Sequence, residues 1–400
     1  MMRYLPRIEV DIETINKFLR EDLKMKKKVL SAILSVAMVA ALLVGCGNAA
    51  EETEAPAATE EAPAEEAPAE EAEAPAEDAA PAEDAAAGGG TYAFVSKSAG
   101  NPFNERQATG FEEAVADLGG TAIIQHPESA TADAQITVIQ SLISQGVDSI
   151  CVAANDENAL QAALEEAAAE GIKVCSVDST VNVASRLTHV NQAGVTEIGQ
   201  CLMDAVYDIT GGEGQWAILS ATSQAANQNA WIESMKEIMA ADEKYAKLEL
   251  VEVAYGDDEP QKSTDQTQAL LQNYPDLKVI CAPTTVGIAA AAKVLQDQGS
   301  SVKLTGLGLP SEMAEYIGDD DAHSCPYMFL WNPIDLGRLG AYTSAALVNG
   351  DITGAEGDTF TAGDMGDYTV VKAGDGGTEI ILGAPFKFDP SNIEEWKEVY

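Results

Sequence analysis

From residue 91 onward, short apolar runs alternate with segments that have the apolar spacing of helices. The run 92–96 is followed by a helical pattern over 103–118, and further runs come at 121–125, 149–152 and 173–177. Apolar runs of this length without polar alternation predict strands that are buried on both faces, as in a parallel sheet covered by helices. This alternation restricts the body of the chain to an α/β fold.

The same alternation starts again near residue 195. Helical patterns and strand-like runs then follow one another in the order 195–209, 215–220, 230–239, 248–253, 262–272, 278–281, 288–298 and 302–306. Two such arrays predict two lobes, each with its own doubly wound parallel sheet. Because ligands of open α/β sheets bind beyond the carboxyl ends of the strands, two facing edges predict an interlobe cleft.

Polar and aromatic residues follow the predicted strands at these carboxyl ends. Lys97 comes directly after the first run, and Asp178 ends the fourth. A charge next to a buried strand needs a partner, because an unpaired charge is costly away from water. The residues beyond the strand ends are therefore the candidate ligand contacts: Lys97, Asn101, Phe103, Asp156, Asn158, Asp178, Asn227, Gln228, Pro283, Thr285, Trp331 and Asn332.

The chemistry of this set favours a neutral ligand with many hydroxyl groups. Carboxylates and amides form paired hydrogen bonds with neighbouring hydroxyls, and aromatic faces cover the C–H side of a sugar ring. Structural roles compete with ligand contact at several positions. Asn155, Asp156 and Ser179 are equally suited to cap helices, and Phe103 and Trp231 to fill a core.

The chain resembles the type I periplasmic binding proteins, and within them the sugar-binding group that serves rhamnose and autoinducer-2 importers. The resemblance covers residues 91–400. It rests on these stretches: Phe94-Val-Ser-Lys97, Asp178-Ser-Thr180, Val190-Asn-Gln192, Asn227-Gln-Asn-Ala-Trp231, Cys281-Ala-Pro283, Thr305-Gly-Leu-Gly308 and Leu330-Trp-Asn332.

The resemblance also implies roles for individual residues. In autoinducer-2 binders the site contains a lysine, an aspartate, an Asp-Gln pair, a proline and an alanine, and four of these are matched here by Lys97, Asp178, Gln228 and Pro283. Two positions depart from that pattern. Asn227 replaces the aspartate of the pair, and Thr285 stands in place of alanine. These changes argue against autoinducer-2 and leave a rhamnose-like or other monosaccharide.

Members of this family cross between their lobes three times. By analogy we place the crossings near 190–192, 328–332 and 360–366. The first lobe is then expected to comprise 91–190 plus 332–360, and the second 191–328 plus 366–400. Closure of the lobes would present a ligand-loaded shape to an ABC permease.

The segment before the body has the anatomy of a bacterial lipoprotein signal. Three lysines after Met25 precede the apolar run 29–44, which ends in Leu43-Val-Gly-Cys46 and is short for a membrane span. We expect acylation of Cys46 and anchoring to the cell membrane from outside the cytoplasm. A signal peptide cut nearby, or a weak transmembrane anchor, is the alternative. Residues 1–24 are interpreted as an upstream extension, with translation starting at Met25.

Residues 47–90 are rich in Ala, Pro and Glu. Between Glu51 and Asp84 they contain fourteen acidic residues and no basic one. Such a composition is too polar to bury a core, so we expect a disordered tether that holds the body away from the membrane. An acidic ligand-binding tail is the alternative interpretation.

Charge and cysteine content narrow the function classes. The chain has a formal net charge of −42, so we expect no binding to nucleic acid. Five cysteines remain in the body (Cys151, Cys175, Cys201, Cys281 and Cys325), and buried free thiols are favoured over disulfides. The three histidines are scattered, so neither a metal site nor a cofactor is expected.

Three function classes compete. The favoured one is a lipid-anchored, monomeric receptor that delivers a monosaccharide to an ABC importer. A receptor that presents a sugar or autoinducer-2 to a signalling partner is the alternative, and the sequence does not separate it from transport. An enzyme that uses Asp156 and Asp178 as an acid/base pair is disfavoured, because no known catalytic motif accompanies them. We therefore predict a protein with no catalytic residues.

Overall fold

The computed structural model describes residues 89–400, which fall within one compact unit of the chain. The predicted upstream extension (1–24), the signal segment (25–46) with Cys46, and the tether up to residue 88 lie outside the described residues.

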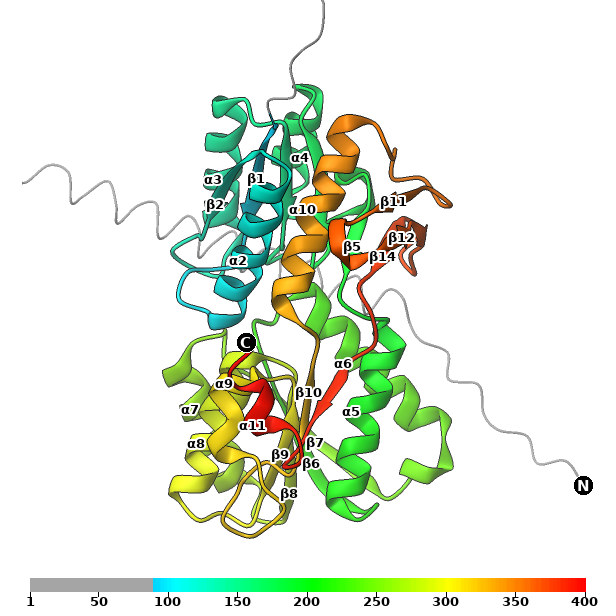
Figure 1. Ribbon diagram of the computed structural model, residues 1–400. Coiled ribbons are helices and arrows are strands. Elements are labelled where there is room, and N and C mark those ends of the chain that lie inside the picture. The colour runs from blue at the N-terminus through cyan, green and yellow to red at the C-terminus, as the bar shows by residue number, and fades with distance from the viewer. Residues whose placement is uncertain (1–88) are drawn as a thin grey trace, which may run out of the picture. The chain divides into compact units, whose positions relative to one another are not determined.

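The first lobe is built on a seven-stranded sheet with the strand order β13-β14-β5-β4-β3-β1-β2 (Figure 1). Neighbouring strands are parallel except for β13 and β14, which pair antiparallel. The continuous apolar runs give its central strands, which are buried almost throughout. The strands are β1 (Thr91–Val95), β2 (Thr121–Gln125), β3 (Ser149–Val152), β4 (Lys173–Val177), β5 (His189–Asn191), β13 (Val371–Lys372) and β14 (Thr378–Ile381).

Helices cover both faces of this sheet. On one face, Phe94 and Cys151 share a core with Phe111, and on the other Val95 packs in a core with Ile139. The helices of the first face are α2 (Pro102–Asp117) and α10 (Pro333–Asn349), and those of the second are α3 (Ala132–Gln145) and α4 (Gln161–Ala169). The sheet is therefore doubly wound, as the alternating pattern predicts.

Helix α10 comes from late in the chain and packs closely on α2 (Figure 1). A Cβ atom at Gly337 would lie 1.9 Å from the carbonyl oxygen of Gln107, so only glycine permits this approach. This contact returns a C-terminal segment to the first lobe.

The second lobe contains a four-stranded parallel sheet with the order β7-β6-β8-β9. In Figure 1, α7 and α8 lie on one side of this sheet and α5 with α6 on the other. Its elements are α5 (Val195–Thr210), β6 (Gly214–Ser220), α6 (Ala226–Ala241), β7 (Leu248–Tyr255), α7 (Pro260–Asn273), β8 (Leu277–Ala282), α8 (Thr285–Asp297), β9 (Lys303–Gly306) and α9 (Pro310–Met313).

A separate antiparallel pair, β10 (Met328–Leu330) with β15 (Phe386–Phe388), adjoins this sheet through a bridge between Leu307 and Phe329. The remaining elements are short: the pair β11 (Thr359–Thr361) and β12 (Asp367–Thr369), α11 (Ile393–Trp396), and four single-turn helices, Val183–Ser185, Glu243–Tyr245, Ala314–Tyr316 and Gly363–Met365.

The chain passes between the lobes at three places. It leaves the first sheet after β5 and enters α5, and it returns between β10 and α10. The third passage lies between β14, which pairs with β5, and β15, which pairs with β10. The crossing expected near 360–366 is therefore wrong, as is the assignment of all of 366–400 to the second lobe. The strands β13 and β14 extend the first sheet, and hydrogen bonds to β5 hold them there.

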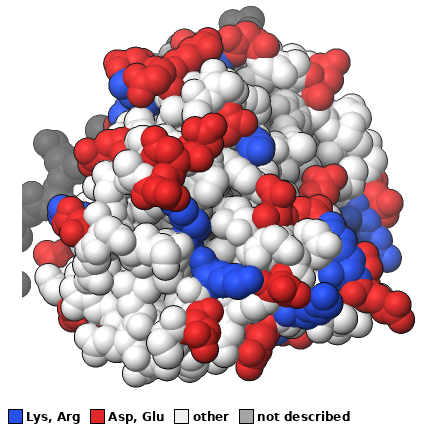
Figure 2. Space-filling view, turned by 90° about the horizontal axis from the view of Figure 1, so that it is seen from below, with Lys and Arg blue, Asp and Glu red and all other residues white. Residues whose placement is uncertain are grey.

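Acidic groups dominate the charged surface. Figure 2 shows groups of Asp and Glu with fewer Lys and Arg between them. The five body cysteines are unpaired, and four of them are buried. Between residues 89 and 400, no helix has the length and apolar character needed to cross a membrane. Within the same range, no three His, Cys, Asp or Glu side chains are grouped so as to hold a metal ion.

Candidate functional site

A small cavity lies between the lobes, at the edges where the strands of both sheets end. Eight of the predicted residues line it: Lys97, Asn101, Phe103, Asp178, Gln228, Pro283, Thr285 and Trp331.

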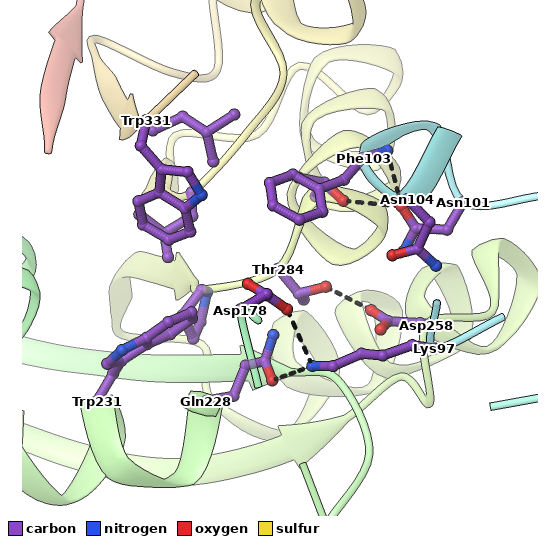
Figure 3. Close-up of a pocket in the computed structure, with 14 residues that line it drawn as sticks. Lys97, Asn101, Phe103, Asn104, Asp178, Gln228, Trp231, Asp258, Thr284 and Trp331 are labelled. Carbon is purple, nitrogen blue, oxygen red and sulfur yellow. Dashed lines mark hydrogen bonds and ion pairs between the residues drawn. The ribbon is translucent and has the colours of Figure 1, made fainter. Parts of the chain in front are cut away.

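Lys97 is the centre of the polar side of the cavity (Figure 3). Its side chain is buried, and its Nζ donates hydrogen bonds to Asn227 Oδ1 at 2.9 Å and Gln228 Oε1 at 3.3 Å. The same atom lies 3.7 Å from Asp178 Oδ2. The lysine and the aspartate belong to the first lobe, whereas both amides belong to the second, so Lys97 joins the two lobes.

Two side chains fix the backbone around Lys97. Asn155 donates to the Lys97 carbonyl oxygen at 2.8 Å, and Gln135 donates to the Ser96 carbonyl oxygen at 2.9 Å. Gln135 also accepts from the Asn155 backbone N–H at 2.8 Å. These bonds tie the segments that follow β1 and β3 together, so the lysine is held before any ligand arrives.

Asp178 adopts a strained backbone conformation. Its φ of 61° lies in the left-handed region, where a non-glycine residue is uncommon. Its backbone N–H donates to the Val190 carbonyl oxygen at 3.0 Å, which holds the turn. Burial raises the pKa of the Asp178 carboxyl group, Lys97 opposes that rise, and the negative charge of Asp258 adds to it. A strained, buried carboxylate at a cleft is a feature of functional sites.

The two amides of the second lobe come from the first turn of α6. The sequence pattern predicts a helix from residue 230, but the observed helix begins at Ala226, so Asn227 and Gln228 are helical. Asn227 Nδ2 donates to Asp178 Oδ2 at 3.2 Å while its Oδ1 accepts from Lys97. An aspartate at this position would lack the donor that contacts Asp178.

Asp258 and Thr284 also line the cavity, and neither is among the residues predicted from the sequence. Asp258 follows β7, has a φ of 54°, and accepts a hydrogen bond from the Thr284 hydroxyl. Burial raises the pKa of the Asp258 carboxyl group, and the Thr284 hydrogen bond and Lys97 oppose this rise. The signal was available, because Gly256-Asp257-Asp258 stands at the carboxyl end of a predicted strand.

Three aromatic rings form the apolar side of the cavity. Trp331 packs edge-on against Phe103, with ring centroids 6.3 Å apart, and against Trp231 at 5.7 Å. Leu307 and Leu330 lie beside them in the wall. The sequence analysis did not decide whether Trp231 is a core residue or a ligand contact. It did not single out the two leucines or Asn104, which also lines the cavity.

Four predicted contacts lie elsewhere. Asn227 is bonded to Lys97 and Asp178 but lines an adjoining cavity. Asp156 accepts hydrogen bonds from the backbone N–H groups of Asn158 and Ala159, and Asn332 accepts from those at the start of α10. The structure therefore does not bring Asp156, Asn158 or Asn332 to the cavity wall. For Asp156 and Asn332, local capping bonds of the backbone explain the position.

The chain is similar to known proteins in sequence and in structure. The model of a family described as "periplasmic binding protein domain" matches residues 92–352. An ABC transporter solute-binding protein from Clostridium phytofermentas, solved with bound L-rhamnose, is 62% identical; the match covers 78% of this chain and 99% of that one, with a TM-score of 0.77.

Two further proteins are similar to this chain at lower sequence identity. The LsrB protein from Clostridium saccharobutylicum, solved in complex with AI-2, is 23% identical, with 76% of this chain and 99% of that chain covered and a TM-score of 0.71. Among curated proteins, a D-apiose import binding protein from Actinobacillus succinogenes is 22% identical over 58% of this chain and 72% of its own length.

Proposed function

This chain belongs to the periplasmic binding protein family, and from that membership we propose that it captures L-rhamnose or a closely similar monosaccharide and delivers it to an ABC importer. The observation that carries the proposal is the junction at Lys97. There, carboxylate and amide groups from both lobes meet around one buried amine beside an aromatic wall.

The two sides of the cavity fit the two kinds of surface on such a sugar. Asp178 and Gln228 provide acceptors, and Gln228 an amide donor as well, for ring hydroxyls. Trp331, Leu307 and Leu330 provide apolar contacts for the methyl group of rhamnose and for ring C–H groups. The protein that shares 62% identity and was solved with L-rhamnose supports this choice.

Autoinducer-2 fits this site less well. Asn227 contributes an amide donor where the resemblance implies a carboxylate, and that donor is directed to Asp178. Thr285 adds a hydroxyl and bulk where an alanine would stand, and it lines the cavity. Thr285 changes a group presented to the ligand, whereas Asn227 acts through its hydrogen bonds with Lys97 and Asp178.

Transport follows from binding and closure, without a chemical step. The sugar would first contact the Lys97–Asp178 pair, which lies within one lobe, and the amides of α6 would then close over it. Closure about the three interlobe segments would present the loaded shape to a permease. In this proposal the protein acts as a monomer that is anchored by lipid at Cys46 through the tether 47–90.

A thermal-shift screen of the purified protein against neutral monosaccharides tests the sugar assignment. L-rhamnose is expected to give the largest rise in Tm, because a ligand at about 100 times its Kd stabilises the folded state by about 2.7 kcal/mol. No shift with any neutral monosaccharide would contradict the proposal. For the anchor, the unmodified protein should incorporate labelled fatty acid and the Cys46→Ala variant should not; no label in the unmodified protein would contradict lipid attachment.

A further inference from the structure

Asp258 is a charged group of the cavity that the proposed function does not use. Within residues 89–400, the charged side chains that line the cavity are Lys97, Asp178 and Asp258. The first two form the ion pair of the first lobe, whereas Asp258 follows β7 of the second lobe. A carboxylate in a cleft, with a pKa shifted by burial, is a candidate functional group.

The turn after β7 places Asp258 at the cavity without help from a ligand. Asp257 and Asp258 both have a φ of 54°, in the left-handed region. Two backbone hydrogen bonds hold the turn: the Gly256 N–H donates to the Ser220 carbonyl oxygen at 2.9 Å, and the Asp257 N–H donates to the Ala221 carbonyl oxygen at 3.2 Å. Two consecutive non-glycine residues in this region are costly, and such strain is concentrated at functional sites.

Only part of the hydrogen-bonding capacity of Asp258 is used by the protein. Its Oδ1 accepts a hydrogen bond from the Thr284 hydroxyl group (Figure 3). In the described part of the chain, no other hydrogen bond or ion pair involves this carboxylate, and the residue is only partly buried. An ionised carboxylate has about four acceptor sites on its two oxygens. Asp258 therefore presents unused acceptor capacity to whatever occupies the cavity.

Lys97 does not neutralise this second carboxylate by contact. Its ammonium group has three N–H donors, and its Nζ lies 2.9 Å from Asn227 Oδ1, 3.3 Å from Gln228 Oε1 and 3.7 Å from Asp178 Oδ2. One cation and two carboxylates leave one net negative charge at the cavity. The cavity therefore disfavours an anion and favours a ligand that donates hydrogen bonds.

We propose that Asp258 is a specificity-determining residue, which accepts a hydrogen bond from one ring hydroxyl of the sugar while Asp178 accepts from another. The inference rests on the proposed function and narrows its substrate class. Neutral sugars with hydroxyl donors for a carboxylate of each lobe are bound, and anionic sugars such as uronates, aldonates and sugar phosphates are rejected.

Calorimetry with L-rhamnose on the Asp258→Asn variant tests this role. Asparagine tolerates the left-handed backbone and can still accept from Thr284, but the charge and an open acceptor are lost. Affinity should fall about 10–100-fold, as for the loss of a hydrogen bond to a charged group, while the Tm stays equal or rises. Asp257→Asn is the matched control, because this neighbour has the same φ and does not line the cavity; its affinity should change less than about threefold.

The monodeoxy analogues of L-rhamnose, each lacking one hydroxyl group, separate direct contact from an indirect effect. One analogue should bind the unmodified protein more weakly than L-rhamnose and lose little further affinity in Asp258→Asn, because the contact is already missing. An equal loss for L-rhamnose and every analogue would show that Asp258 acts only through the structure, and unchanged L-rhamnose affinity would remove it from the site. Either result overturns this inference and leaves the proposed function intact.

The rejection of anions has its own test. L-mannuronate carries a carboxylate in place of the methyl group of L-rhamnose, and it should compete for the site at least about 100-fold more weakly. Competition as strong as that of L-rhamnose would contradict the proposed charge selection. Failure of the unmodified protein to bind any neutral monosaccharide would overturn the proposed function itself, and this inference with it.

Discussion

The two lobes contribute different chemistry to the cleft. The first lobe supplies an ion pair, with Lys97 Nζ 3.7 Å from Asp178 Oδ2, and the turn at Asp178 is strained. The second supplies neutral amides to the lysine, from the first turn of α6, and its own carboxylate at Asp258 is hydrogen-bonded to Thr284 within that lobe.

This difference explains how the cleft can open. Because both members of the ion pair lie in one lobe, separation of the lobes does not pull opposite charges apart. Opening instead breaks hydrogen bonds to the amides of Asn227 and Gln228, and water can replace these bonds. The first lobe is therefore organised before the ligand binds, and the second completes the site.

The largest expected effect comes from breaking the ion pair of the first lobe. Lys97→Met should lower the free energy of unfolding by about 3 kcal/mol at neutral pH, because Asp178 is left buried without its cation. The loss should shrink as the pH falls. Without Lys97, the pKa of Asp178 lies further above its unfolded value, so the folded state binds the proton more tightly.

Denaturant unfolding at several pH values measures this effect. The double variant Lys97→Met/Asp178→Asn is the control, and it should recover much of the lost stability because no charge is left unpaired. Equal instability of the single and double variants would show that the pair does not organise the first lobe.

The next effect concerns the contribution of the first lobe to sugar binding. Asp178→Asn keeps the shape and tolerates the left-handed backbone, but it removes the carboxylate. Affinity for the sugar should fall by about 30–150-fold, equivalent to roughly 2–3 kcal/mol. Calorimetry measures it, with Asp156→Asn as a matched control outside the cavity. Unchanged affinity in Asp178→Asn would remove this residue from the site.

A smaller effect is expected from two substitutions in the second lobe, which should change the preference for one ligand over another. The double change Asn227→Asp and Thr285→Ala should shift the ratio of autoinducer-2 to L-rhamnose affinity about tenfold toward autoinducer-2, or about 1.4 kcal/mol. Competition binding reports the ratio, and the exposed Asn158→Asp serves as control. An unchanged ranking would mean that these positions do not select the ligand.

The smallest effect is a pH dependence of stability that belongs to the first lobe. His189 is buried, and its pKa falls from 6.5 to about 3 on folding. Below pH 6.5 the unfolded chain therefore binds a proton that the folded one does not, and stability should decrease by about 1 kcal/mol over the first pH unit. His189→Gln should flatten this slope; an unchanged slope would assign it to other groups.

The sequence predicted several strands of the first sheet well because their signal is local and strong. The runs at 149–152 and 173–177 inside the sheet, and the run at 121–125 at its edge, are strands with the same bounds in the structure. Strands β13 and β14 were missed because they are short and partly exposed, and hydrogen bonds to distant residues hold them in place. The third crossing was misplaced for the same reason.

Some residues of the candidate site were also predicted correctly and others were not. Lys97, Asp178 and Gln228 line the cavity as expected, because the carboxyl ends of parallel strands converge at one edge. Asp156 and Asn332 are directed instead to nearby backbone N–H groups, and residue type alone does not distinguish a capping carboxylate or amide from a ligand contact. Asp258 follows the end of a predicted strand, but its place in the cavity depends on a turn with two consecutive left-handed residues, so the strand-end signal alone did not single it out.

A crystal structure of the complex with L-rhamnose addresses the shared role of the lobes most directly. We expect one sugar ring in the cavity, with hydroxyl oxygens in hydrogen-bond distance of Lys97 or Asp178 from one lobe and of Asn227 or Gln228 from the other, and with its methyl group against Trp331 and the leucines. A sugar held by one lobe alone, or bound outside this cavity, would contradict the shared role.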